Sequence, residues 1–186
     1  ETVYGINTGF GLLANERIPA GRLAELQRNL ILSHSCGLGD ALPRYVTRLM
    51  IVLKLLGLGR GYSGVRPEVI GALQGLLDRD AMPVIPAQGS VGASGDLAPL
   101  AHMTAALMGF GWIDLAGERV AAGEALQRLG LAPLELGPKE GLALINGTQF
   151  SAAIALDSLF AADRVFGAAL AAGALSVDAL KGSVKP

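Results

Sequence analysis

Apolar residues recur every three to four positions along much of the chain, and this spacing predicts amphipathic helices. We expect a first helix at about residues 20–36, a second that starts after Pro43, and a third at residues 67–78. The positions expected to face the core are Leu23, Leu26, Leu30 and His34 in the first helix, Leu49, Val52, Leu53 and Leu56 in the second, and Val69, Ile70, Leu73, Leu76 and Leu77 in the third.

The second half of the chain alternates predicted loops, short elements and long helices. Residues 79–95 are predicted to form a long loop, buried by Met82, Val84, Ile85 and Val91. The later elements are a helix at about 97–110 that Asp96 caps, a hairpin in "WIDLAGERV", short helices in "AGEALQRLG" and "GPKEGLALING", and an Ala-rich helix at about 148–172. The predicted fold class is therefore mainly α: long packed helices with a buried Gly-rich loop and a minor β-hairpin.

Composition narrows the classes of partner and compartment. The formal net charge of −1 gives no bulk attraction to nucleic acid or to an anionic membrane. The single Cys36 excludes an internal disulfide, and with only two histidines no metal site is expected. "LMIVLKLLGLG" is too short for a membrane span and contains Lys54, so we expect no membrane contact. The single cysteine fits a reducing compartment, so we expect a cytoplasmic protein. The basic residues of "KLLGLGRG" are interpreted as a solvated helix end.

Both ends of the chain read as interior sequence. It opens with "ETVYGINTGFG" and stops at "GSVKP", without an evident cap or tail. We expect residues 1–186 to be the central part of a larger catalytic domain, with no boundary inside them.

The stretch "QGSVGASGDLAPL", residues 88–100, is unusually poor in side chains. It has three interpretations. The first is a flexible turn before a helix that Asp96 caps. The second is a phosphate-binding loop, although the usual Lys and glycine spacing of such loops are missing. The third is a segment whose main chain reacts. In the third interpretation the Gly95 nitrogen attacks the Ala93 carbonyl carbon, and loss of two waters, one with the Ser94 hydroxyl, leaves a ring with an electron-poor exocyclic alkene.

The residues support the third interpretation through a family resemblance. "GSVGASGDLAPLAHM" resembles the signature of the aromatic amino acid ammonia-lyase family, whose Ala-Ser-Gly becomes 4-methylideneimidazole-5-one (MIO). "VYGINTGFG" resembles the family's catalytic tyrosine loop, and "INGTQ" its asparagine segment. The resemblance implies that Ala93, Ser94 and Gly95 form the cofactor without a metal, that Tyr4 transfers a proton on a lid loop, and that Asn146 binds the prosthetic group or the substrate.

Two adjacent residues bear on the substrate. Family members that act on histidine resemble Ser-His at a position on an early helix, those that act on tyrosine His-Leu, and those that act on phenylalanine mostly Phe-Leu. This chain has Ser33-His34, which implies elimination of ammonia from L-histidine to give trans-urocanate. The alternatives are a tyrosine or phenylalanine lyase, an aminomutase, or a non-catalytic helical assembly module. Whether the substrate amine or the substrate ring attacks the electrophile is left open.

The resemblance also implies residues and partners that these 186 positions do not supply. The family uses an arginine for the substrate carboxylate, a second tyrosine and a glutamate, and no segment here resembles those regions. Its active sites are shared between subunits of a homotetramer. We therefore expect a homotetramer for the full-length protein and no turnover by residues 1–186 alone. His102 is interpreted as a packing residue, and Cys36 as inert.

Overall fold

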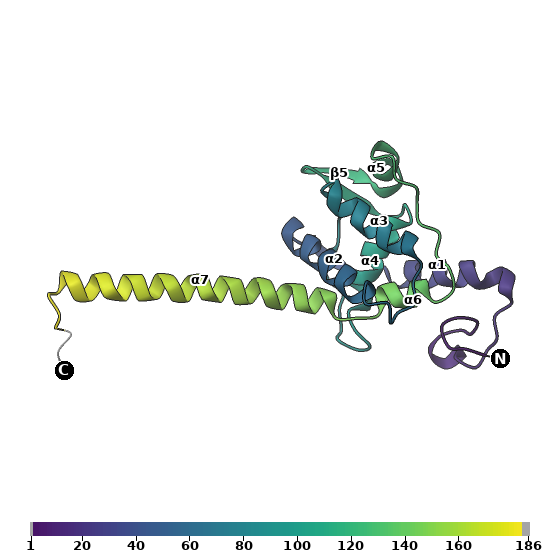
Figure 1. Cartoon of the computed structure of the whole chain (residues 1–186), viewed down its shortest axis with the longest axis horizontal. Helices are drawn as coiled ribbons and strands as arrows, with labels where there is room; N and C mark the ends of the chain where they lie inside the picture. Colours follow the sequence, from purple (N-terminus) through teal and green to yellow (C-terminus); the bar gives the residue numbers. More distant parts are fainter. Residues whose placement is uncertain (1, 184–186) are drawn as a thin grey trace. The chain divides into compact units, whose positions relative to one another are not determined.

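The computed structural model describes residues 2–183. The chain divides into two compact units, Glu1–Ala153 and Ile154–Pro186. The first unit is mainly helical, as predicted (Figure 1). Its helices are α1 (Leu23–His34), α2 (Arg44–Leu58), α3 (Pro67–Asp78), α4 (Leu97–Leu107), α5 (Ala122–Arg128), α6 (Glu140–Ile145) and the start of α7 (Gln149–Ala179), with 3₁₀ turns η1 (Gly11–Leu13) and η2 (Ala20–Arg22).

Helix α4 forms the centre of this unit. Nine of its eleven residues are buried, and it packs against both α1 and α6, which also contact each other. Alanines at 98, 101, 105 and 106 present little side-chain bulk, so neighbouring helices can approach α4 closely. Because α4 directly follows the glycine-rich loop, this packing anchors the end of the loop.

Helix α2 packs against α3 (Figure 1). The face that it buries is not the one that the sequence predicted. Leu56 is exposed, and Leu49, Val52 and Leu53 are only partly buried. The buried positions are Val46, Thr47, Met50, Ile51, Lys54 and Leu58. The apolar run is nearly continuous around this helix, so its periodicity did not define a unique inner face. Helix α3, in contrast, has its predicted bounds, with Pro67 in the first turn and Val69, Leu73 and Leu76 buried.

Short strands interrupt the long loop predicted at residues 79–95. Strand β2 (Ala81–Pro83) pairs antiparallel with β4 (Trp112–Leu115), which forms the predicted hairpin with β5 (Glu118–Ala121). Strand β3 (Pro86–Gln88) pairs with β1 (Leu38–Ala41), which the sequence did not predict. Met82 and Ile85 are buried as expected, whereas Val91 is exposed. Strands of three or four residues are too short to show a clear alternation of apolar and polar positions.

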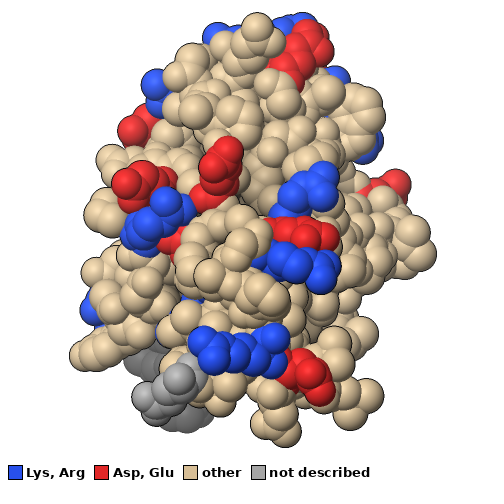
Figure 2. Space-filling view, turned by 90° about the vertical axis from the view of Figure 1, so that its right-hand side faces the viewer, with Lys and Arg blue, Asp and Glu red and all other residues tan. Residues whose placement is uncertain are grey.

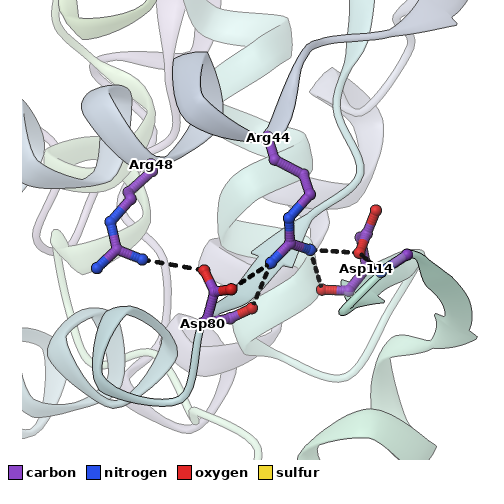
Figure 3. A network of polar contacts seen from close by, with 5 residues as sticks. Arg44, Arg48, Asp80 and Asp114 are labelled. Atoms are coloured by element: carbon purple, nitrogen blue, oxygen red, sulfur yellow. Dashed lines mark hydrogen bonds and ion pairs between the residues drawn. The ribbon is translucent and has the colours of Figure 1, made fainter.

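A polar network connects α2 to the turn before β2, which contains Asp80, and to Asp114 of strand β4 (Figure 3). The Arg44 guanidinium donates to the Asp80 carbonyl and carboxylate, each at 2.8 Å, and to the carbonyl and carboxylate of Asp114. Arg48 donates to the other Asp80 oxygen at 3.0 Å. Asp80 has a φ of +50°, so these bonds hold a residue in a backbone conformation that L side chains rarely adopt.

Helix α7 is longer than predicted, since it continues to Ala179. By length and composition it is apolar enough to cross a membrane, since an 18-residue stretch of it has a mean hydropathy of 1.4. The sequence-based expectation of no such segment did not foresee this. Asp163 and Arg164 interrupt this apolar stretch. Elsewhere charges are mixed: on the face shown in Figure 2, cationic and anionic side chains are interspersed between uncharged residues.

Candidate active site

The Ala93–Ser94–Gly95 tripeptide lies between β3 and α4, in a segment with unusual backbone geometry. Gly92, Ser94 and Gly95 have φ values of +69°, +59° and +103°. For Ser94 this left-handed conformation costs roughly 1–2 kcal/mol. Residues 91–94 are exposed and only the Asp96 end is buried, which differs from the expectation of a buried loop. The small side chains of this segment offer little apolar area whose burial would favour a covered loop.

Gly95 lies directly against the turn between α6 and α7. It forms a parallel bridge with Gly147, and the next main-chain N–H, that of Asp96, donates to the Gly147 carbonyl at 2.7 Å. A Cβ on Gly95 would lie 2.5 Å from the Gly147 oxygen and 2.7 Å from its nitrogen. Only glycine fits this position, and the absence of a side chain is also what a nitrogen that attacks a nearby carbonyl requires. The residues present therefore fit MIO formation.

Asp96 occupies the predicted N-cap position of α4, but its side chain does not cap the helix. The carboxylate is buried, and it accepts hydrogen bonds from the Ser90 hydroxyl at 2.7 Å, the Ser151 N–H at 2.8 Å and the Ser151 hydroxyl. These bonds join both ends of the glycine-rich loop to the first turn of α7. The prediction that Asp96 caps α4 is therefore wrong for its side chain. The carboxylate accepts hydrogen bonds from Ser90 and Ser151 instead of from the first N–H groups of α4.

Tyr4 lies on the N-terminal loop, where its ring meets Phe10 edge to face with centroids 6.0 Å apart. The ring is half exposed. The loop is held by Gln27 of α1, whose amide nitrogen donates to the Gly5 carbonyl at 3.4 Å and whose oxygen accepts the Gly141 N–H of α6 at 2.9 Å. This fully buried glutamine connects the tyrosine loop to α6, the helix that Asn146 follows. The sequence did not indicate this role of Gln27, because its two partners lie 22 and 114 residues away.

Ser33 and His34 form the last turn of α1. His34 is half buried, and its Nδ1 lies 2.8 Å from the Leu30 carbonyl and 3.2 Å from the Ser33 hydroxyl. Because a carbonyl only accepts, Nδ1 carries the proton in the neutral ring, and Nε2 has the lone pair. Ser33 is exposed and donates to the Leu30 carbonyl at 3.1 Å.

His102 does more than pack. Its Nε2 accepts the Gly37 N–H at 3.0 Å and so holds the segment that follows His34. Burial lowers the pKa of His102, which favours the neutral ring that this acceptor role needs. Cys36, in the same segment, is exposed.

Asn146 follows α6 and is exposed, and its carbonyl accepts a hydrogen bond from the Lys54 ammonium at 3.0 Å. The interpretation of the Lys54 region as a solvated helix end is wrong for this residue, which is only 2% exposed. The signal was present in the sequence: Lys54 lies three residues after Ile51 and four before Leu58, at helical spacing within an apolar run.

The structure thus brings together two of the three motifs. Gly95 and Asp96 contact Gly147, directly beside Asn146. The contacts described for Tyr4 and His34 within residues 2–183 are with their own segments and do not reach residues 93–95.

Comparison with known proteins shows the family of this chain. A family model for the aromatic amino acid lyases matches residues 1–186, so the chain belongs to the aromatic amino acid lyase family. The chain is 61% identical over 184 residues to a histidine ammonia-lyase of Bradyrhizobium diazoefficiens, a match that covers 99% of this chain and 36% of the relative.

Solved structures give the same family. The structure resembles histidine ammonia-lyase from Trypanosoma cruzi with a TM-score of 0.91 and 39% identity, over 98% of this chain and 36% of that one. It also resembles phenylalanine aminomutase from Pantoea agglomerans, with a TM-score of 0.93 and 32% identity, over 100% of this chain and 36% of that one. The chain therefore spans little more than a third of the length of these relatives.

Proposed function

We propose that the protein to which this chain belongs is a carbon–nitrogen lyase that eliminates ammonia from L-histidine to give trans-urocanate. The proposal rests on family membership, on the histidine ammonia-lyases among the relatives, and on the Ser33-His34 pair. One observation carries the chemistry: Gly95 is pressed against Gly147 in a conformation that only glycine adopts. A main chain held in this conformation, without a side chain at position 95, favours condensation of Ala93, Ser94 and Gly95 into MIO.

When formed, MIO supplies an electrophile that the ordinary side chains lack. The chain's own residues prepare its surroundings. Helix α4 begins two residues after Gly95, so its positive end lies near the tripeptide, where negative charge is stabilised. The Asp96 carboxylate and the Gly147 carbonyl fix the main chain on that side.

His34 is proposed to recognise the substrate ring. With its proton on Nδ1 and shared with the Leu30 carbonyl, it offers Nε2 as an acceptor for an imidazole N–H. A phenyl ring has no such donor and would leave the acceptor unpaired. Ser33, on the preceding position, is proposed to contribute a further hydroxyl to the same pocket.

Tyr4 and Asn146 complete the proposed set. Tyr4 transfers a proton at the substrate, on a loop whose glycines permit it to close over the site. Asn146 donates or accepts a hydrogen bond at the substrate or the prosthetic group. Neither role needs a metal ion.

A second candidate is supported by one observation, the likeness to phenylalanine aminomutase. Its TM-score is as high as that of the histidine ammonia-lyase structure, although its identity to this chain is lower. An aminomutase, or a lyase for tyrosine or phenylalanine, would use the same tripeptide with a different contact to the ring.

We further propose that the full-length protein is a cytoplasmic homotetramer and that residues 1–186 are the central part of its catalytic domain. Large apolar side chains along the second unit support an assembly, because exposed apolar surface of this extent favours association. They are Leu159, Phe160, Val165, Phe166, Leu170 and Leu175. We expect the isolated chain to be inactive, which histidine with urocanate absorbance as readout would test.

The deciding experiment combines intact mass with turnover in the full-length protein. We expect the mass to be lower than the sequence predicts by two water molecules, and histidine to be converted to urocanate in preference to phenylalanine or tyrosine. Ser94→Ala should restore the full mass and reduce turnover by roughly a thousandfold or more. Unchanged turnover with Ser94→Ala would exclude the proposed electrophile, and a β-amino acid product would identify an aminomutase.

A further inference from the structure

Lys54 is buried in an environment that favours an uncharged residue. It lies on the inner face of α2, with Met50, Ile51 and Leu58 also fully or nearly buried on that helix. Burial lowers its pKa from 10.5 to about 8. A buried ammonium costs several kcal/mol unless its donors are satisfied. An unbranched apolar residue of similar length, such as methionine, would fill the same space without that cost.

The partners of this ammonium are two neutral oxygens. The Lys54 Nζ donates to the Asn146 carbonyl at 3.0 Å and lies 3.5 Å from the Gln149 Oε1. Two other charged residues of this unit are as deeply buried. Glu140 pairs with the opposite charge of Arg66, whereas the Asp96 carboxylate, like Lys54, is held by neutral groups, those of Ser90 and Ser151. Within residues 2–183 Lys54 therefore has directional hydrogen bonds and no ion pair with a carboxylate, which is a poor arrangement for stability alone.

Both oxygens belong to one turn, the link between α6 and α7. Asn146 is followed by Gly147, whose carbonyl accepts the Asp96 N–H and whose backbone bridges to Gly95. The Lys54 ammonium is thus one peptide unit away from the surface that meets the tripeptide. A shift of the Asn146 carbonyl would displace both the Asn146 side chain and the Gly147 contact.

We infer that Lys54 is a positioning residue for this site: its ammonium group holds the main chain of Asn146, and so sets the register of Asn146 and Gly147 against residues 93–95. This inference rests on the proposed function, because it assigns Lys54 a task in the same reaction. Lys54 acts through Asn146 and Gly147 and does not itself contact the tripeptide.

The test uses Lys54→Met and Lys54→Arg in the full-length protein. Lys54→Met removes the donors and nearly keeps the volume, whereas Lys54→Arg keeps a cation with N–H donors. Lys139→Met is the matched control, because Lys139 also donates to a main-chain carbonyl, that of Ser63, at 3.2 Å. The readouts are kcat and KM for histidine, the thermal midpoint, and hydrogen–deuterium exchange of the Asp96 amide.

For Lys54→Met we expect kcat to fall roughly 10- to 100-fold with a smaller change in KM, as for a displaced catalytic group. The thermal midpoint should be equal to or above that of the parent protein, and the Asp96 amide should exchange faster. Lys54→Arg should recover part of kcat, and Lys139→Met should match the parent in kcat and in Asp96 exchange. If Lys54→Met does not fold, Lys54→Gln, one bond shorter than lysine, gives the same readouts.

Parental kcat or parental exchange of the Asp96 amide in Lys54→Met would overturn the inference. Failure of the proposed function looks different: the parent protein itself would lack turnover and the loss of two water molecules. The exchange measurement needs no turnover, so it judges the role of Lys54 in either case.

Discussion

The main-chain N–H of Asp96 donates to the Gly147 carbonyl at 2.7 Å, and this bond joins the glycine-rich loop to the turn that carries Asn146. The two segments are held together from both sides. On one side, the Asp96 carboxylate accepts from the Ser151 N–H and hydroxyl. On the other, Lys54 donates to the Asn146 carbonyl. The contact between Gly95 and Gly147 is therefore fixed by buried polar groups, which keep a unique geometry better than apolar packing does.

Gly95→Ala should prevent formation of the ring. The added Cβ would lie 2.5 Å from the Gly147 oxygen, and the φ of +103° is unfavourable for alanine. We expect a destabilisation of about 2–4 kcal/mol in urea unfolding and the full, unreduced mass of the full-length protein.

Gly92→Ala is the matched control for this prediction. Gly92 also has a positive φ, of +69°, but a Cβ there would meet no atom within 4 Å. It should lose about 1 kcal/mol of stability from backbone strain and still show the reduced mass. Equal mass losses in both variants would mean that the contact with Gly147 is irrelevant to ring formation.

We expect the free energy of unfolding to decrease as the pH falls below 6.5, because His102 is buried. Burial lowers the pKa of His102 in the folded state below its ordinary value of 6.5, so the unfolded chain binds a proton first. The contribution of the neutral ring is complete above about 6.5 and is lost as the pH falls through the lowered folded-state pKa. Protonation would also turn Nε2 into a donor that faces the Gly37 N–H.

The measurement is the free energy of unfolding between about pH 7.5 and pH 5, because this interval brackets the ordinary histidine pKa. His102→Gln keeps an acceptor oxygen and does not titrate, so its stability should change less over this interval. A parental slope in His102→Gln would assign the pH dependence to other groups.

We expect a separate loss of stability at lower pH, which arises from Glu140. Burial by itself would raise the pKa of Glu140, but hydrogen bonds from the Arg66 side chain and from the main-chain N–H groups of Arg66 and Gly137 lower it below 4.5. The stability from the charged carboxylate is complete above about 4.5 and is lost as the pH falls through the lowered folded-state pKa.

Unfolding in urea between about pH 6 and pH 3 checks this prediction, since that interval brackets an ordinary glutamate pKa. Glu140→Gln should be less stable at pH 6 and should lose less on acidification. The control is Glu118→Gln, an exposed partner of Arg128, which should keep the parental acid dependence. If Glu118→Gln flattened the curve as much as Glu140→Gln, the buried carboxylate would not be its source.

The sequence predicts local features of this chain well and long-range polar contacts poorly. Helix α3 was predicted to the residue because Pro67 marks its start and its apolar positions follow one face. Asp96 was placed correctly at the start of α4, but its carboxylate bonds to Ser151, a partner far along the chain that no local spacing encodes. The burial of Lys54 follows from its helical spacing with Ile51 and Leu58, but its acceptor, the Asn146 carbonyl, belongs to the main chain and has no signature in the sequence.

Gln27→Met should loosen the tyrosine loop. The fully buried Gln27 amide joins the Gly5 carbonyl to the Gly141 N–H, and methionine fills a similar volume without either bond. A buried N–H left unpaired costs about 1–3 kcal/mol, which we expect as a lower free energy of unfolding. Hydrogen–deuterium exchange of residues 2–10 should also become faster, because the loop loses a bond that ties it to α1.

Gln74→Met, at an exposed position of α3, is the control and should change neither quantity. Unaltered exchange of the loop in Gln27→Met would show that contacts other than Gln27 hold Tyr4 in place, and the link between the tyrosine loop and α6 would then have no role in the site.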